Sequence, residues 1–132
     1  MSYYYKKHFT PEEANKTLPL VKQIARDILT HGFEIKAVAD SLNNDVEQMK
    51  EDERIAKLSK KIRGFIEELE ELGCYYNDWN FTIGLVDFPA IIDGEEVYLC
   101  WKSDEEEVKY FHGLEEGYAG RKLISEAFST SV

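Results

Sequence analysis

Apolar and small residues recur at alternating spacings of four and three through the first third of the chain, and this repeat constrains the fold most. Its members are Ala14, Leu18, Val21, Ala25, Ile28, Gly32, Ile35, Ala39 and Leu42. Such a repeat places one side chain per turn on a single face of a helix, which then packs lengthwise against a second helix. The sequence therefore predicts a long helix that ends near Leu42.

The residues that precede this repeat predict where the helix begins. Thr10 can cap the first turn, Pro11 suits the first helical position, and Glu13 completes a capping box with Thr10. Pro19 lies inside the repeat and removes one backbone donor, so we expect a kink there.

A second helix is predicted from about Val46 to Leu72, after a polar break at residues 43–45. Its apolar seam consists of Ile55, Leu58, Ile62, Phe65, Leu69 and Leu72. Gly73 is the expected left-handed stop, because glycine adopts positive φ at little cost. Two long helices joined by a short polar turn form an antiparallel hairpin.

β-branched and aromatic residues replace the helical pattern in the second half of the chain. They fill residues 82–92 and 95–101, which flank Asp93-Gly94, a strong signal for a two-residue hairpin turn. Residues 108–112 indicate one further strand, and residues 74–78 a fourth if they contribute. A sheet this small needs a helical face to pack on.

These patterns predict an α+β fold in a single domain: a long antiparallel helical hairpin packed with a small three- to four-stranded antiparallel sheet. The hairpin occupies residues 9–73, the sheet and a glycine- and arginine-containing motif occupy residues 74–124, and a tail covers residues 125–132. Tyrosines at residues 3–5 predict a short strand or an ordered arm before the first helix.

The charge and cysteine content exclude several classes of protein. The formal net charge is −10, which repels phosphate backbones and disfavours nucleic-acid binding. No apolar run approaches the ~20 residues of a membrane span, and the sequence shows no signal peptide. The two cysteines, Cys74 and Cys100, are too few for a disulfide scaffold. We therefore expect a cytoplasmic protein with reduced, unbridged thiols.

Apolar residues beside the two helical seams predict self-association. Leu20, Ile24 and Val38 flank the first seam, and Ile66 flanks the second. Stripes this wide exceed what a small sheet can cover, so we expect a homo-oligomer built through the helices.

Four sequence blocks in a fixed order resemble a known family. "FTPEEANKTLPLV", "GLVDFPA", "DGEEVYLCWK" and "YFHGLEEGYAGRK" are similar to blocks of a bacterial family catalogued as domain of unknown function 2203. The resemblance covers Phe9 to about Ile124 and implies the order of the blocks but no reaction. The family pattern leads us to expect an aromatic-Trp-His run, whereas this chain has Tyr110-Phe111-His112, which removes an indole beside His112.

The last of these blocks is the main candidate for a ligand site. We single out Asp87, His112, Glu115, Glu116, Gly117, Gly120 and Arg121. Arginine offers a planar fork for a carboxylate or phosphate, glycines free the backbone to turn, and histidine can act as an acid or base. These residues predict either a small-anion site or a structural motif in which Arg121 pairs with Asp87, Glu115 or Glu116. Asp87 is the leading internal partner.

Cys100 raises two further alternatives. Strand alternation places Cys100 on the same face as Tyr98, and His112 lies on the following strand, so a cysteine nucleophile is one alternative. A buried structural cysteine is favoured, since free cysteines are usually buried. Asp87, Cys100, His112 and Glu115 or Glu116 also offer metal ligands. The chain has no short C-x-x-C or H-x-x-x-H spacing, however, so we predict no metal and no cofactor.

The sequence leaves two functional classes and assigns no reaction. The favoured class is a soluble homo-oligomeric binding or interaction module. The alternative is a small-molecule enzyme or anion-binding protein that uses an Asp/His/Glu/Arg cluster.

Overall fold

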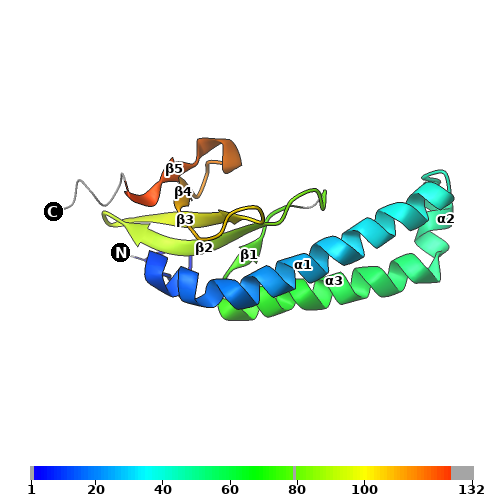
Figure 1. The fold of residues 1–132 in the computed structure, drawn as a ribbon, viewed down its shortest axis with the longest axis horizontal. Helices are drawn as coiled ribbons and strands as arrows, with labels where there is room; N and C mark the ends of the chain where they lie inside the picture. The colour runs from blue at the N-terminus through cyan, green and yellow to red at the C-terminus, as the bar shows by residue number, and fades with distance from the viewer. Residues whose placement is uncertain (1, 79, 126–132) are drawn as a thin grey trace.

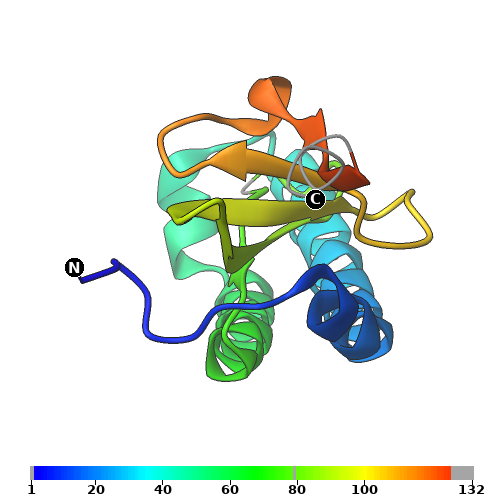
Figure 2. The same ribbon diagram turned by 90° about the vertical axis from the view of Figure 1, so that its left-hand side faces the viewer.

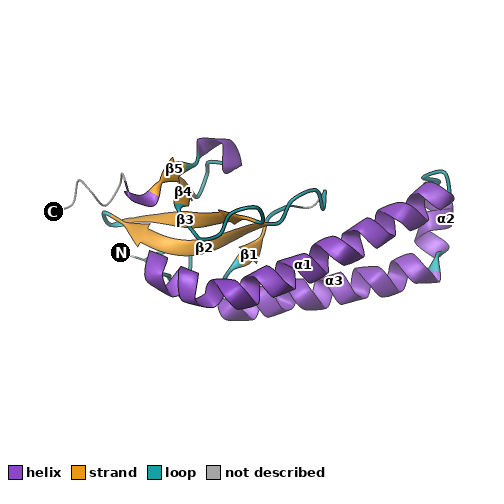
Figure 3. Cartoon of the chain, in the orientation of Figure 1, coloured by secondary structure: helices purple, strands orange, loops and turns teal. Residues whose placement is uncertain are grey.

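The computed structural model of the chain describes residues 2–78 and 80–125. Within these residues, helices precede an antiparallel sheet (Figures 1 and 3). The helices are α1 (Pro11–Ser41), α2 (Val46–Glu51) and α3 (Glu53–Leu72). The strands are β1 (Tyr75–Tyr76), β2 (Leu85–Ile92), β3 (Glu95–Lys102), β4 (Tyr110–Gly113) and β5 (Lys122–Leu123), with a 3-10 helix, η1 (Tyr118–Gly120), before β5. The α+β prediction is confirmed.

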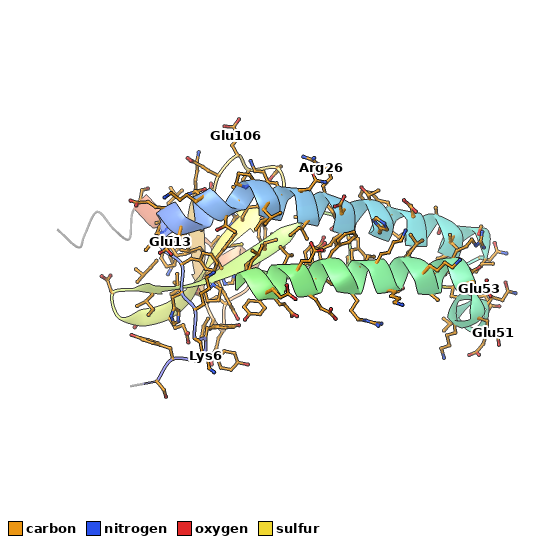
Figure 4. All side chains as sticks on the ribbon, turned by 90° about the horizontal axis from the view of Figure 1, so that it is seen from below. Lys6, Glu13, Arg26, Glu51, Glu53 and Glu106 are labelled. Atoms are coloured by element: carbon orange, nitrogen blue, oxygen red, sulfur yellow. The ribbon has the colours of Figure 1, made fainter. Side chains whose placement is uncertain are left out.

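The helical hairpin forms as its end signals predict. The Thr10 hydroxyl accepts from the Glu13 backbone, and the Glu13 carboxylate accepts from the Thr10 N–H, so the capping box closes. α1 then continues through Pro19. α1 and α3 lie side by side along their length (Figure 4). Gly73 ends α3 with φ +98°, in the predicted left-handed conformation.

The second helix is not continuous, and this prediction was wrong in detail. Asp52 interrupts it with extended backbone, and its carboxylate accepts from the N–H groups of Arg54 and Ile55. Because that carboxylate satisfies the first donors of a new helix, α3 begins at Glu53 and α2 becomes a separate short helix. α2 lies at the far tip of the hairpin (Figure 1).

The sheet is a meander of order β1-β2-β3-β4-β5 in which every described pair is antiparallel. Asp93 and Gly94 form the predicted turn with φ +53° and +80°, which sets the β2–β3 register. Three to four strands were predicted. β1 supplies the fourth, and the two-residue β5 adds a fifth that has no periodic signal.

The sheet has two faces of different chemistry. Alternate residues, including Val86, Phe88, Leu99 and Trp101, enter the core against α1 and α3. The intervening positions form an outer face, defined by Asp87, Tyr98, Cys100, Tyr110 and His112, which points away from the helices.

Residues before α1 form an ordered arm. The Tyr4 and Tyr5 N–H groups donate to the Glu96 carboxylate, and the Phe9 N–H donates to the Pro89 carbonyl. The arm crosses from the α3 side to the α1 side (Figure 2). No strand forms within residues 2–10, so of the two predicted alternatives the arm is correct.

Two further expectations can be checked in the described residues. Cys74 and Cys100 are both free, and both are buried, although burial was predicted for Cys100 alone. No helix there has the length and apolar character needed to cross a membrane. The predicted tail lies largely outside the described residues, which end at residue 125.

Candidate functional site

Asp87, Cys100 and His112 come together on the outer face of the sheet and are called here the Asp–Cys–His cluster. Asp87 on β2 is the register partner of Cys100 on β3, and His112 on β4 is the register partner of Tyr98, two residues before Cys100. One donor atom from each residue lies within 4.8 Å of the others. The three residues are 4%, 1% and 2% exposed, respectively.

Hydrogen bonds fix the imidazole ring of His112. Its Nδ1 lies 2.9 Å from the Gly113 carbonyl oxygen, and its Nε2 lies 3.1 Å from Asp87 Oδ1. A carbonyl only accepts, so Nδ1 carries a proton and donates it. Nε2 therefore faces a carboxylate oxygen, so either a proton shared by these two atoms or a cation in contact with both must lie between them.

The electrostatics of His112 favour the protonated ring when no metal is bound. Burial on its own lowers the pKa of His112, but hydrogen bonds to Asp87, Cys100 and the Gly113 carbonyl outweigh it and raise the pKa to about 10. The cluster thus holds a positive charge against the carboxylate.

The other two members of the cluster are equally constrained. Asp87 Oδ2 accepts from Asn77 Nδ2 at 3.1 Å, so both carboxylate oxygens have partners. Burial raises the pKa of the Cys100 thiol, partly offset by its hydrogen bond to His112 and the positive charge of Arg121. A buried thiol with a raised pKa is a poor nucleophile.

The geometry also differs from a Cys-His-Asp catalytic triad. In a triad, the acid binds one ring nitrogen and the nucleophile uses the other. Here Asp87 occupies Nε2, and the remaining nitrogen, Nδ1, donates to the Gly113 carbonyl. The three donor atoms instead lie within 4.8 Å of one another, close enough to contact one ion together.

A pocket of about 260 Å³ opens beside the cluster and is called here the outer-face pocket. Its walls are Tyr75, Tyr76, Asn77, Asp87, Tyr98, His112, Leu114 and Glu116. Asp87 and His112 thus reach the pocket, whereas Cys100 is not part of its wall.

Of the two predicted glycines, only Gly120 lies against another side chain in this region, that of Glu116. Glu116 Oε1 accepts from the Gly113 N–H at 2.9 Å. A Cβ on Gly120 would lie 2.8 Å from Glu116 Oε2, so a larger residue there would displace the end of the Glu116 side chain. Gly117 has open space around it, and Glu115 is exposed and not part of the pocket wall.

Arg121 does not pair with Asp87, and this prediction was wrong. Its Nη2 lies 2.7 and 2.5 Å from the two carboxylate oxygens of Glu105. Its guanidinium carbon lies 4.0 Å from the ring centre of Tyr110 and 4.9 Å from that of Tyr118. Neither Glu115 nor Glu116 forms an ion pair with Arg121 in the described residues.

Glu105 was overlooked because it lies in a run of four acidic residues, 104–107, in the turn that follows β3. That turn folds back: Trp101 Nε1 donates to the Glu105 carbonyl, and the Lys102 N–H donates to its carboxylate. The sequence reasoning also missed Asn77, whose amide binds Asp87. A strand-register argument could have paired Asp87 with Cys100, because each lies six residues from the two-residue turn.

Comparison of the sequence with models of protein families finds one matching family. A model described as "Uncharacterized conserved protein (DUF2203)" matches residues 7–124. The chain has no match among curated proteins or solved structures.

Proposed function

The chain belongs to the DUF2203 family of uncharacterized conserved proteins, and since that description names no activity, we propose a function from the site itself: the protein binds a divalent transition-metal ion through Asp87, Cys100 and His112. One observation carries this proposal. Donor atoms of three different kinds, from three adjacent strands, converge to within 4.8 Å while buried.

The donor set selects the class of metal. Nitrogen, sulfur and oxygen ligands together suit a borderline ion such as Zn²⁺, whereas Ca²⁺ and Mg²⁺ prefer oxygen ligands. A thiolate and a carboxylate would neutralise the two charges of the ion, which matters in a buried site. Binding would displace the protons held by Cys100 and His112.

The residues around the cluster supply the support that metal ligands need. The Gly113 carbonyl holds Nδ1–H of His112, which leaves Nε2 as the ligand atom, and Asn77 holds the second oxygen of Asp87. Such outer partners orient the ligands and typically contribute about 10- to 100-fold to metal affinity.

Metal titration of the purified protein tests the proposal. Competitive titration with Zn²⁺ and visible absorption with Co²⁺ should show one equivalent bound and a thiolate-to-cobalt absorption band. Cys100→Ala should abolish the band, and Asn77→Ala should weaken binding by about 10- to 100-fold. Cys74→Ala is the matched control, because Cys74 is the other buried free cysteine. Binding that Cys100→Ala leaves unchanged would refute the proposal.

We propose self-association through the helical hairpin as a second function. The distal part of the hairpin extends beyond the sheet (Figure 1). Phe33 and Leu20 on α1 are each 52% exposed. A groove of about 450 Å³ also lies between the hairpin and Phe81, with Ile35, Ser59, Ile62, Arg63 and Ile66 as its other walls. Ile24, one of the four residues predicted to be surplus, is instead buried in the core.

A second copy of the chain is the proposed partner of these exposed apolar residues and of the groove beside Phe81. Light scattering at micromolar concentration should give at least a dimer, and Phe33→Glu should shift it to the monomer. Glu34→Gln is a control at the neighbouring exposed position. A monomer at every concentration would contradict this second proposal.

The proposed location is a reducing compartment such as the cytoplasm. Two buried, unbridged thiols support it, because free cysteines persist where glutathione and thioredoxin keep thiols reduced.

A further inference from the structure

We infer that a metal held by Asp87, Cys100 and His112 keeps one coordination position open toward the outer-face pocket, where a small neutral or monoanionic ligand exchanges with water. This inference rests on the metal site proposed above. It adds that the metal binds an external ligand, so the site is not a purely structural metal site.

The number of protein ligands leaves a position free. Structural zinc sites are closed by four protein ligands, whereas sites with three protein ligands keep the fourth position for water or substrate. In the described residues the converging group consists of three such side chains. Glu116 lies nearby, but one of its oxygens already accepts from the Gly113 N–H.

The free position faces the pocket because of where each ligand lies. Asp87 and His112 form part of the pocket wall, and Cys100 does not. All three residues are buried, and Cys100 is the one that does not reach the pocket, so its sulfur lies on the side of the cluster away from the pocket. An ion in contact with all three donors therefore has the pocket on its remaining side.

The pocket limits the size of the ligand. Its volume of about 260 Å³ falls below the range of roughly 300–1,000 Å³ that is typical of sites for drug-sized molecules. Tyr75, Tyr98 and Leu114 supply ring and aliphatic surface to its walls. A ligand of a few heavy atoms with one donor atom for the metal fits these walls.

The charge around the pocket limits the charge of the ligand. Asp87 and Cys100 would already balance a divalent ion, and the carboxylate of Glu116 on the pocket wall adds a further negative charge. A multiply charged anion is repelled there, whereas a neutral or singly charged donor is tolerated.

The Co²⁺-loaded protein tests this inference directly. Imidazole and azide should each change the visible spectrum in a saturable way, as expected when a ligand replaces water on the metal. Glu116→Gln retains an acceptor for the Gly113 N–H but removes the charge. It should tighten azide binding by about twofold to fivefold, the range expected when one solvent-screened charge is removed. Glu115→Gln is the matched control, because Glu115 is the adjacent acid and does not line the pocket.

Each other outcome overturns a specific step. A cobalt spectrum that neither imidazole nor azide alters means a closed site, which refutes this inference but leaves the metal proposal standing. A large loss of Co²⁺ affinity in Glu116→Gln makes Glu116 the fourth ligand and also closes the site. Equal azide affinities in the two glutamine variants refute the role of Glu116. Failure to bind Co²⁺ at all refutes the proposed function itself.

Discussion

Arg121→Ala tests the ion pair between Arg121, which precedes β5, and Glu105, which follows β3. The side chain of Arg121 is 9% exposed and that of Glu105 is 17% exposed. Breaking an exposed ion pair costs about 0–1 kcal/mol in the free energy of unfolding, and breaking a fully buried one costs about 3–5 kcal/mol. The cost for this partly buried pair should lie between these two values. The rings of Tyr110 and Tyr118 add about 0.5–1 kcal/mol each. Glu105 keeps one partner, the Lys102 N–H, which reduces the loss.

These contributions give an expected loss of about 2–3 kcal/mol in the free energy of unfolding for Arg121→Ala. At about 3–4 °C per kcal/mol for a chain of this size, the melting temperature should fall by about 6–12 °C. Arg121→Lys should recover only part of the loss, because lysine lacks the planar guanidinium that lies against the rings of Tyr110 and Tyr118.

Urea unfolding monitored by circular dichroism measures these free energies, with Lys122→Ala as an exposed control. A double-mutant cycle with Glu105→Gln isolates the ion pair and should show a coupling of about 1–2 kcal/mol. The reasoning fails if Arg121→Ala unfolds within about 0.5 kcal/mol of wild type, the range of an ordinary surface substitution. It also fails if the coupling with Glu105 is near zero.

Three further predictions concern the backbone, the core and the thiols. Gly73→Ala should destabilise the protein by about 1 kcal/mol or more, because the backbone φ at Gly73 is +98°. Gly64→Ala should instead stabilise it by up to about 1 kcal/mol, because Gly64 lies in the interior of α3 with open space around it. Equal melting temperatures for the two variants would contradict this prediction. Ile28→Lys places a charge at a position with no exposed surface, so circular dichroism should show an unfolded chain. Burial raises the pKa of Cys74 to about 12, so mass spectrometry should find Cys74 and Cys100 alkylated only after denaturation; rapid native alkylation of either would refute the prediction.

The elements with local signals could be predicted from the sequence. The capping box at Thr10, the stop at Gly73 and the turn at Asp93-Gly94 all depend on residues within four positions of one another. The prediction that the second helix ends at Leu72 was correct for the same reason, because Gly73 follows directly. Its interruption at Asp52 was missed because a capping aspartate inside a helical repeat is outweighed by the apolar period around it.

The site separates into a part that could be predicted and a part that could not. Asp87 and Cys100 flank a two-residue turn, whose geometry fixes their register before any tertiary contact forms. The sequence also marked Asp87 and His112 as candidate ligand-site residues. It disfavoured a metal because the donors are far apart along the chain, and chain distance is a poor guide when each donor lies on a different strand.

By itself, then, the sequence determined the first long helix, the end of the second and the central hairpin, since periodicity and turn residues act locally, and it marked Asp87, His112 and Arg121 as candidate site residues. Only the tertiary structure decided which of those residues meet. His112 reaches the cluster across a seven-residue connection, 103–109, whose length does not fix a register, and the β3–β4 pairing sets its place. Arg121 finds Glu105 because that same connection folds back through Trp101 and Lys102. Such long-range pairings depend on the packing of the whole sheet, so no short stretch of sequence encodes them.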